Sequence, residues 1–333
     1  PLIDCMVRLI KPQAGEVIQD PAAGTGGFLV AADRSIRQAT DDLYSLNPEQ
    51  SHFQRHNAFR GAELVRDTYR LCLMNLLLHG IESPIDCINS LEAVGEKMGK
   101  ADLILTNPPF NRFPNRVNRP DFSITAGAAQ GPIPFIEHVV RSLNPGGRAA
   151  VVLSDSVLFG DNVGQDIRRY LMDLCDLHTI LRLPTGIFYA QGVKTNVLFF
   201  TRGQTNKGNT KAVWVYDMRA NMNAFGKTRL LTEKDFEEFE KAYGDDPNGK
   251  AKRIDQGPDG RFRCFTRKEI ADRDDNLDLS WLQDDNDEAE DTLVDPEDIA
   301  AAIMSHLRTA LEEIEALTVE LSPVKVDSLQ EAA

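Results

Sequence analysis

A glycine-rich turn between a short strand and a helix is the feature that most constrains the fold of this chain. The segment Asp20-Pro-Ala-Ala-Gly-Thr-Gly-Gly27 follows a strand predicted at 16–19, and a helix is predicted from Phe28. Its three glycines let the backbone turn tightly and approach a ligand without obstruction from a Cβ atom. Open α/β sheets bind nucleotides at such turns, beyond the carboxyl ends of their strands. The turn therefore predicts an α/β fold with a ligand site at one edge of the sheet, although a turn without a ligand remains the alternative.

The chemistry of the turn narrows the class of ligand. No Gly-Lys-Ser/Thr sequence follows it, and the spacing is not that of the GxGxxG dinucleotide fingerprint. Asp20 and Pro21 stand where a pyrophosphate would need donors, and an acid there suits a cofactor with a cationic amino group. We therefore do not expect a nucleoside triphosphate or a dinucleotide.

Short β-rich runs and helical stretches alternate over the first 218 residues, which predicts a largely parallel sheet covered on both faces. Further strands are predicted near residue 58 and at 85–88, 102–106, 148–153 and 177–183, with helices at 1–10, 64–79, 133–143 and 163–176. Two late runs at 197–201 and 212–216 are expected to form a β pair of the kind that closes a sheet in antiparallel fashion.

The pattern weakens after residue 218. Residues 244–261 are rich in Gly, Asp, Lys and Pro and are expected to form a loop, and 284–298 contain nine acidic residues and no basic one. The segment 296–321 then has the period of an amphipathic helix. Its apolar residues recur three or four positions apart: Ile299, Ile303, Leu307, Leu311, Ile314, Leu317 and Leu321. We therefore divide the chain into an α/β domain at 1–218, a loop-rich extension with an acidic linker at 219–292, and a helical tail at 293–333.

Composition excludes several classes of protein. No apolar run approaches the roughly 20 residues of a membrane span, and the first residues do not resemble a signal peptide, so we expect a cytoplasmic protein. The five cysteines are scattered and form no CxxC pair, so neither disulfides nor a metal site are indicated. The net charge of −14 argues against tight, non-specific binding of nucleic acid by this chain alone. It leaves DNA open as a substrate, with another subunit supplying most of the affinity.

A second motif, Asn107-Pro108-Pro109-Phe110, follows a predicted strand about 80 residues after the glycine turn. The amino nitrogen of adenine is a poor nucleophile because its lone pair is delocalised into the ring. The Asn107 carboxamide oxygen and the Pro108 carbonyl can accept hydrogen bonds from both amino hydrogens and so direct that lone pair at a methyl donor. The prolines stiffen the loop, and Phe110 offers a face on which a flipped base stacks. Taken alone, the motif is also compatible with a plain Asn-Pro turn.

Both motifs together, at strand ends and in this order, resemble the amino-methyltransferase superfamily. Segments such as Phe59-Arg-Gly-Ala-Glu63, Leu183-Pro-Thr-Gly-Ile-Phe188 and Gly192-Val-Lys-Thr-Asn196 resemble the modification subunit of type I restriction–modification systems. The resemblance implies a Rossmann-like fold dependent on S-adenosyl-L-methionine, with a mostly parallel seven-stranded sheet, an antiparallel edge pair and a C-terminal helical tail. It covers about residues 1–283.

The resemblance also implies an activity, partners and a set of site residues. The activity is methyl transfer to N6 of adenine in double-stranded DNA, with a specificity subunit and, in some complexes, a restriction endonuclease subunit as partners. Glu63 matches the acid that binds the ribose hydroxyls of the cofactor, and Asn89 stands where the family has an acid beside the cofactor adenine. The residues expected to bind the cofactor are Asp20, Ala22, Gly24, Thr25, Gly26, Gly27, Phe28, Glu63 and Asn89. The region around 192–196 is expected to border the pocket for the target base.

Three alternatives stay open at this point. Glutamine methyltransferases of protein release factors share an Asn-Pro-Pro-aromatic motif, but usually with Tyr in the place of Phe110. Cytosine-N4 methyltransferases usually have Ser in the place of Asn107. A catalytically silent assembly subunit is the third, because the N-terminal helical domain of the family and its Thr-Pro step before Pro1 are absent from this sequence. Those residues normally help to close the methionine end of the cofactor site.

Overall fold

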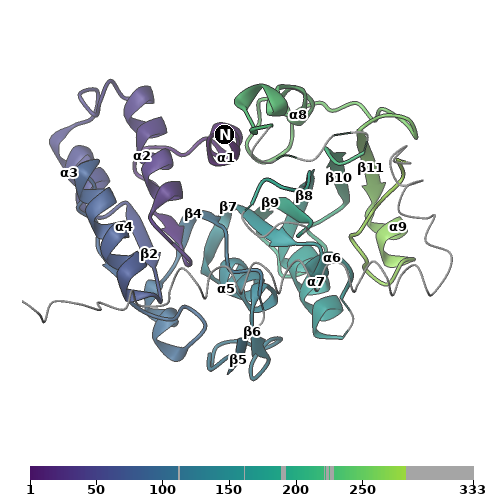
Figure 1. Ribbon diagram of the computed structural model, residues 1–333, viewed down its shortest axis with the longest axis horizontal. Helices are drawn as coiled ribbons and strands as arrows, with labels where there is room; N and C mark the ends of the chain where they lie inside the picture. Colours follow the sequence, from purple (N-terminus) through teal and green to yellow (C-terminus); the bar gives the residue numbers. More distant parts are fainter. Residues whose placement is uncertain are drawn as a thin grey trace, which may run out of the picture. The chain divides into compact units, whose positions relative to one another are not determined.

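A nine-stranded sheet forms the centre of the protein in the computed structural model (Figure 1). The structure describes residues 1–111, 113–160, 162–188, 193–220, 222, 225 and 229–282. In spatial order its strands are β11 (Phe262–Thr266), β10 (Ala212–Asp217), β8 (Cys175–Leu183), β9 (Thr195–Arg202), β7 (Leu143–Ser154), β4 (Ala101–Thr106), β1 (Ile18–Asp20), β2 (Phe59–Ala62) and β3 (Ile85–Asp86). The pairs from β7 through β4, β1 and β2 to β3 are parallel, as is β8 with β10. Strand β9 runs antiparallel to both of its neighbours, and β11 is antiparallel to β10.

Helices cover both faces of this sheet (Figure 1). One face is packed by α1 (Leu2–Ile10), α2 (Gly27–Ala39), α4 (Arg66–Leu78) and α8 (Glu237–Tyr243), and the other by α5 (Pro132–Ser142), α6 (Ser156–Phe159), α7 (Val163–Leu174) and α9 (Arg267–Ala271). Along β4, Leu103 and Leu105 belong to the first core and Ile104 to the second. Because both faces of β4 are buried in this way, its central residues 103–105 form a continuous hydrophobic run.

Three shorter elements complete the described part. Helix α3 (Pro48–His56) lies between α2 and β2, and single turns η1 (Ala93–Met98) and η2 (Glu233–Phe236) precede β4 and α8. A separate hairpin, β5 (Phe113–Arg116) with β6 (Ala129–Gln130), follows the Asn-Pro-Pro-Phe segment. Within the described ranges, no helix has the length and apolar character needed to cross a membrane.

The α/β class and the mostly parallel sheet are confirmed, and the strands and helices predicted up to residue 217 are present. Two details differ. The sheet has nine strands in the described part instead of seven: β3, predicted at 85–88, forms one edge, and β11, which was not predicted, forms the other. The runs at 197–201 and 212–216 do not pair with each other, since β9 inserts between β7 and β8. Local sequence patterns specify a strand but not its neighbours, so this order was beyond prediction.

Helix α3 was not predicted, and its composition explains why. It is polar, and Gln54 is its only buried residue, so no apolar period marks it. It begins instead with a capping box in which Asn47 and Gln50 exchange side-chain and backbone hydrogen bonds, followed by a proline in the first turn.

Residues Pro1–Leu282 form one compact unit. Strand β11, from the segment expected to be a loop-rich extension, pairs with β10 inside it. The boundaries at 219 and 293 remain predictions, and the acidic run and the helical tail lie outside the described residues.

Candidate functional site

The glycine turn leaves β1 at Asp20 and enters α2, at the edge where the parallel strands end. The Ala23 amide donates to the Ala62 carbonyl at 2.9 Å, which ties the turn to β2. Gly26 has a φ of 82°, and a Cβ atom there would lie 3.1 Å from Cys72 Sγ, so close packing against α4 requires this glycine. Gly24 also has a left-handed φ, but the space beside it is open. The two glycines therefore act differently: one allows packing and the other leaves room for a ligand.

Glu63 follows β2 and holds the turn in place. Its Oε2 accepts from the Gly24 amide at 2.9 Å and its Oε1 from the Val65 amide at 2.8 Å. Each carboxylate oxygen retains a further lone pair for a ligand hydroxyl. The acid is thus positioned by its own neighbours before any ligand binds.

Asn89 and Ser90 form the next wall of the site, after β3. The Asn89 amide donates to Gln130 Oε1 at 3.1 Å and to Glu92 Oε1 at 3.2 Å, while its Oδ1 accepts from the Leu91 amide at 3.0 Å. The Ser90 hydroxyl donates to the carbonyl of Pro21 in the glycine turn. The side chain of Asn89 therefore links this wall to the β5–β6 hairpin.

These segments enclose a first cavity of about 370 Å³. Four of the residues predicted to bind a cofactor line it: Ala22, Gly24, Glu63 and Asn89. Asn107 and Pro109 lie in its wall, together with residues that the sequence did not single out, among them Asn115, Gln130 and Phe135. Glu63 is its one charged lining residue within the described part of the chain, and no described Lys or Arg lines it. The cavity is therefore suited to a ligand that carries positive charge.

Asn107 is the first residue after β4, and its position is unusual. It lines the first cavity and also a second one of about 480 Å³. Its Oδ1 is buried and accepts no hydrogen bond from any residue that the structure describes. A buried acceptor without a partner costs free energy unless a ligand supplies the donor. The Asn107 oxygen is therefore available to a bound molecule.

The second cavity is mainly apolar. Phe28, Val152, Ile187 and Phe188 line it, as do Gly27 and residues of α1. The ring of Phe110 meets Phe188 edge to face, with 5.5 Å between the centroids. Aromatic and aliphatic walls beside a buried amide oxygen suit a flat heterocycle with an amino group.

Three of the residues predicted to bind the cofactor, Asp20, Thr25 and Gly26, line neither cavity. Asp20 is 1% exposed, and its Oδ1 accepts from the Ala22 amide at 3.0 Å. Burial raises the pKa of Asp20 to about 7, while the Thr106 hydroxyl and the Ala22 amide act to lower it. Thr25 contributes its carbonyl, which accepts from Asn75 Nδ2 at 2.9 Å. These three residues therefore stabilise the conformation of the glycine turn and do not line either cavity.

A buried polar cluster that the sequence did not reveal lies at the same edge of the sheet. Arg219 donates to both oxygens of Asp155, at 2.9 and 2.6 Å, and to the carbonyls of Leu183 and Thr195. Asn196 donates to Asp155 Oδ1 at 2.6 Å. Although burial opposes it, the pKa of Asp155 is lowered by these contacts with Arg219 and Asn196. The cluster joins the ends of β7, β8 and β9 and so anchors the segment that carries Ile187 and Phe188, whereas Gly192 lies outside the described residues.

Known proteins resemble this chain over nearly its whole length. The model of the N-6 DNA Methylase family matches residues 1–291. The type I restriction enzyme EcoKI methylase subunit of Escherichia coli (strain K12) is 44% identical, over 99% of this chain and 69% of that protein. The StySJI methylase subunit of Salmonella typhimurium (strain LT2) is 45% identical, over 96% and 67% respectively.

Solved structures agree with these relatives. The crystal structure of the type I restriction enzyme EcoKI M protein superposes with a TM-score of 0.83 and 43% identity, covering 99% of this chain and 74% of that one. A putative class I S-adenosylmethionine-dependent methyltransferase of Listeria monocytogenes, at 17% identity and a TM-score of 0.52, shares the fold.

Proposed function

Because this chain belongs to the N-6 DNA methylase family, we propose that it transfers a methyl group from S-adenosyl-L-methionine to N6 of adenine in DNA, as the modification subunit of a type I restriction–modification complex. The observation that carries the proposal is the buried Oδ1 of Asn107, which lies between the two cavities and has no partner among the described residues.

The first cavity fits the adenosyl part of the cofactor. Glu63 faces it with lone pairs for two ribose hydroxyls. Asn89 lies in the same wall, where its Oδ1 keeps one lone pair beyond the bond from the Leu91 amide. No described Lys or Arg lines it, which favours a ligand whose sulfonium and ammonium groups are both positive. The bound cofactor supplies a methyl group on a sulfonium, which is electrophilic and needs no further activation.

The second cavity suits the target base. Ile187 and Phe188 provide apolar surface for a base that has left the helix. Gly27 and Phe28 line the same cavity and remain predicted cofactor residues. Asn107 Oδ1 would accept a hydrogen bond from the adenine amino group, and the Pro108 carbonyl would accept the other. Both bonds place the nitrogen lone pair out of the ring plane and direct it toward the first cavity. The chain thus contributes orientation and proximity, which are the main requirements of an in-line transfer.

The decisive experiment is a transfer assay with labelled cofactor on unmodified duplex DNA, with and without a specificity subunit, followed by nucleoside analysis. We expect the label in N6-methyladenosine. Label in N4-methylcytosine or in a protein glutamine would replace the proposed activity by one of its rivals. Cofactor binding without any transfer, in the presence of the specificity subunit, would identify a silent assembly subunit.

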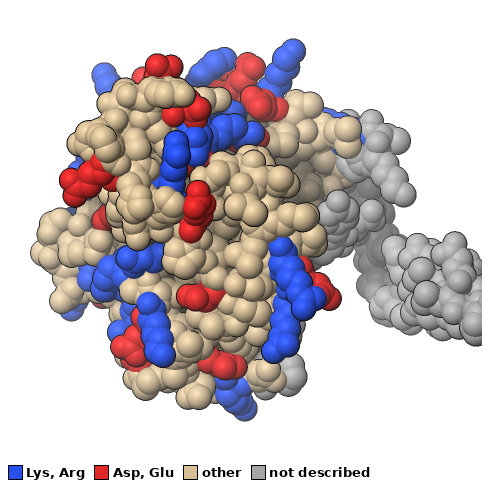
Figure 2. All heavy atoms as spheres, turned by 90° about the vertical axis from the view of Figure 1, so that its left-hand side faces the viewer, with Lys and Arg blue, Asp and Glu red and all other residues tan. Residues whose placement is uncertain are grey.

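DNA and a specificity subunit are the proposed partners, with a restriction endonuclease subunit joining in a complete complex. The face of the molecule around α3 and α4 has Lys and Arg side chains interspersed with Asp and Glu (Figure 2). Such a surface does not hold a duplex by charge alone, in keeping with the net charge of −14. Most of the affinity for DNA would therefore come from the specificity subunit.

The tail beyond residue 293 is the segment that we propose to contact that subunit, because its apolar stripe recurs over about six turns after an acidic linker. Deleting 293–333 should abolish co-purification with the specificity subunit and leave thermal stability and cofactor affinity unchanged. A large fall in melting temperature with the partner retained would show instead that the tail covers its own domain.

A further inference from the structure

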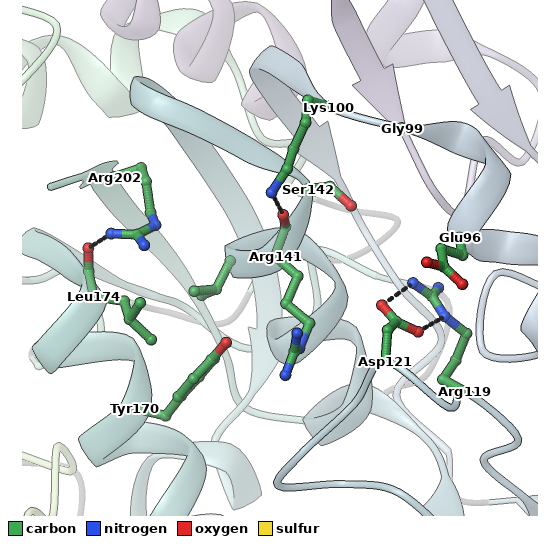
Figure 3. Close-up of a pocket in the computed structure, with 11 residues that line it drawn as sticks. Glu96, Gly99, Lys100, Arg119, Asp121, Arg141, Ser142, Tyr170, Leu174 and Arg202 are labelled. Atoms are coloured by element: carbon green, nitrogen blue, oxygen red, sulfur yellow. Dashed lines mark hydrogen bonds and ion pairs between the residues drawn. The ribbon is translucent and has the colours of Figure 1, made fainter. Parts of the chain in front are cut away.

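Figure 3 shows a third cavity, of about 430 Å³, with the residues that line it. It lies at the opposite end of β4 from Asn107. Lys100 immediately precedes β4 and Asn107 immediately follows it, so the two are about 20 Å apart at 3.3 Å per residue. Lys100 and Arg202 line the cavity with Arg141 and Tyr170, which come from α5 and α7. The cavity therefore takes no part in the site proposed for methyl transfer.

Two of its four cationic side chains are neutralised by carboxylates. Arg119 makes two hydrogen bonds of 2.8 Å to Asp121. Arg141 donates to Glu137 at 3.1 Å, and that carboxylate is fully buried and accepts from three backbone amides besides. These two arginines are held in place by their partners.

Lys100 and Arg202 are different, because their partners are neutral oxygens. The Lys100 ammonium donates to the Arg141 carbonyl. Arg202 donates to the carbonyls of Leu174, Gly203 and Thr205 at 2.6–3.1 Å and to Asn206 Oδ1 at 3.0 Å. No described carboxylate forms an ion pair with either side chain. Two positive charges thus face the cavity without an ion-paired carboxylate among the described residues, and Glu96 is the cavity's other unpaired charge.

The electrostatics of the cavity agree with this geometry. Burial lowers the pKa of Lys100, and the nearby charges of Arg202 and Arg141 lower it further. Burial raises the pKa of Tyr170 while Arg141 and Arg202 act to lower it, so the same two charges reach the phenol. In Figure 3 the Tyr170 hydroxyl lies on the same side of the cavity as Arg141 and Arg202. The positive potential is therefore concentrated in the half of the cavity away from Asp121.

We propose that this cavity binds a phosphate group, with Lys100, Arg202 and the Tyr170 hydroxyl as donors. A tetrahedral dianion accepts hydrogen bonds from several directions and supplies the missing negative charge. The volume lies in the range of small-molecule sites, so a phosphate ester fits as well as the free ion. The phosphate has two sources, a free phosphate compound and the backbone of a DNA segment remote from the reacting base, and the experiment separates them.

The test titrates inorganic phosphate into the full chain by calorimetry, with chloride added to hold the ionic strength constant. Lys100→Gln should bind about tenfold more weakly, the loss expected for one charge-assisted hydrogen bond, and Tyr170→Phe should weaken binding less. Lys97→Gln is the matched control, since Lys97 is exposed on η1 and does not line the cavity. Melting curves of each variant establish that it is folded.

A second arm measures binding of a mixed-sequence DNA duplex to the same proteins. If phosphate binding falls in Lys100→Gln and duplex binding does not, the source is a free phosphate compound. If duplex binding falls in Lys100→Gln but not in Lys97→Gln, the backbone is the source. Equal effects of Lys97→Gln and Lys100→Gln in both arms, or no effect of either, would overturn the proposal.

Discussion

The cavities at the two ends of the parallel strands differ sharply in the charge of their linings. At the carboxyl ends of the parallel strands, the first cavity is lined by neutral and apolar groups with Glu63 as its charged member. At the other edge, the third cavity is lined by Lys100, Arg119, Arg141 and Arg202. Among the described residues, the first cavity is thus lined by one acid and no cation, and the third by four cations and two acids, Glu96 and Asp121.

The two cavities have similar volumes, so the charge of their linings, and not their size, distinguishes the two sites. A sulfonium ligand is repelled by a nearby cation and a phosphate is attracted to it. The same fold therefore offers two ligand classes at opposite ends of β4. Changing the charge at either end should affect one ligand and leave the other alone.

Removing the acid from the first cavity should have the largest effect on this contrast. Glu63→Ala deletes the acceptor of the proposed ribose hydroxyls and the anchor of the Gly24 amide, so cofactor affinity should fall by about 1–3 kcal/mol, or roughly fivefold to 150-fold. Equilibrium binding of labelled cofactor measures the change. Glu96→Ala, at the third cavity, is the control and should leave cofactor affinity as it is. Equal losses in both variants would remove the distinction between the edges.

Titrating Asp20 should produce a smaller effect. Its raised pKa of about 7 means that the carboxyl is neutral below pH 7 and charged above it, so a cationic cofactor should bind several-fold more tightly at pH 8 than at pH 6. The same shift makes the free energy of unfolding fall as pH rises from about 4 to about 7, because the folded state holds a proton that the unfolded state releases.

Asp20→Asn is the matched variant for that experiment. It should flatten the pH dependence and bind the cofactor at pH 8 about as weakly as the unmodified chain does at pH 6. A pH profile unchanged by the substitution would assign the titration to another group.

Placing a cation in the first cavity should give the smallest effect. Asn115 is exposed and lines this cavity, so Asn115→Lys should weaken cofactor binding by about 1 kcal/mol, an interaction typical of charges several ångströms apart near a surface. Asn115→Asp should strengthen binding slightly, and added salt should reduce both changes. Effects of the same sign in both variants would indicate lost packing instead of charge.

The site residues that could be predicted from the sequence are those that belong to a short local motif after a strand. Gly24 and Asn107 belong to local motifs that follow predicted strands, and parallel strands bring such residues to one edge. Gln130 and Phe135 could not be predicted, because they reach the cavity through a hairpin and a helix turn that carry no motif. Thr25 and Gly26 were predicted to bind the cofactor, but they line neither cavity.

Contacts between residues that are distant in the sequence could not be predicted either. Asp155 and Arg219 are 64 positions apart, after β7 and β10, and meet because Arg219 reaches across the ends of β8 and β9 to Asp155. Neither residue belongs to a local pattern, so the sequence marked neither. The cations of the third cavity are likewise gathered from four segments, and only the folded chain shows that two of them have no carboxylate partner among the described residues.

In the proposed function, Asn107 binds the amino group of the target base and does not bind the cofactor. The most direct test measures cofactor affinity and methyl transfer for Asn107→Ala in one preparation with the specificity subunit. We expect the affinity for the cofactor to stay within a few-fold of that of the unmodified chain. Methyl transfer to adenine should fall on the order of 10²–10³-fold, as when one transition-state hydrogen bond is removed. Loss of cofactor binding in parallel with activity, in a variant that remains folded, would contradict it.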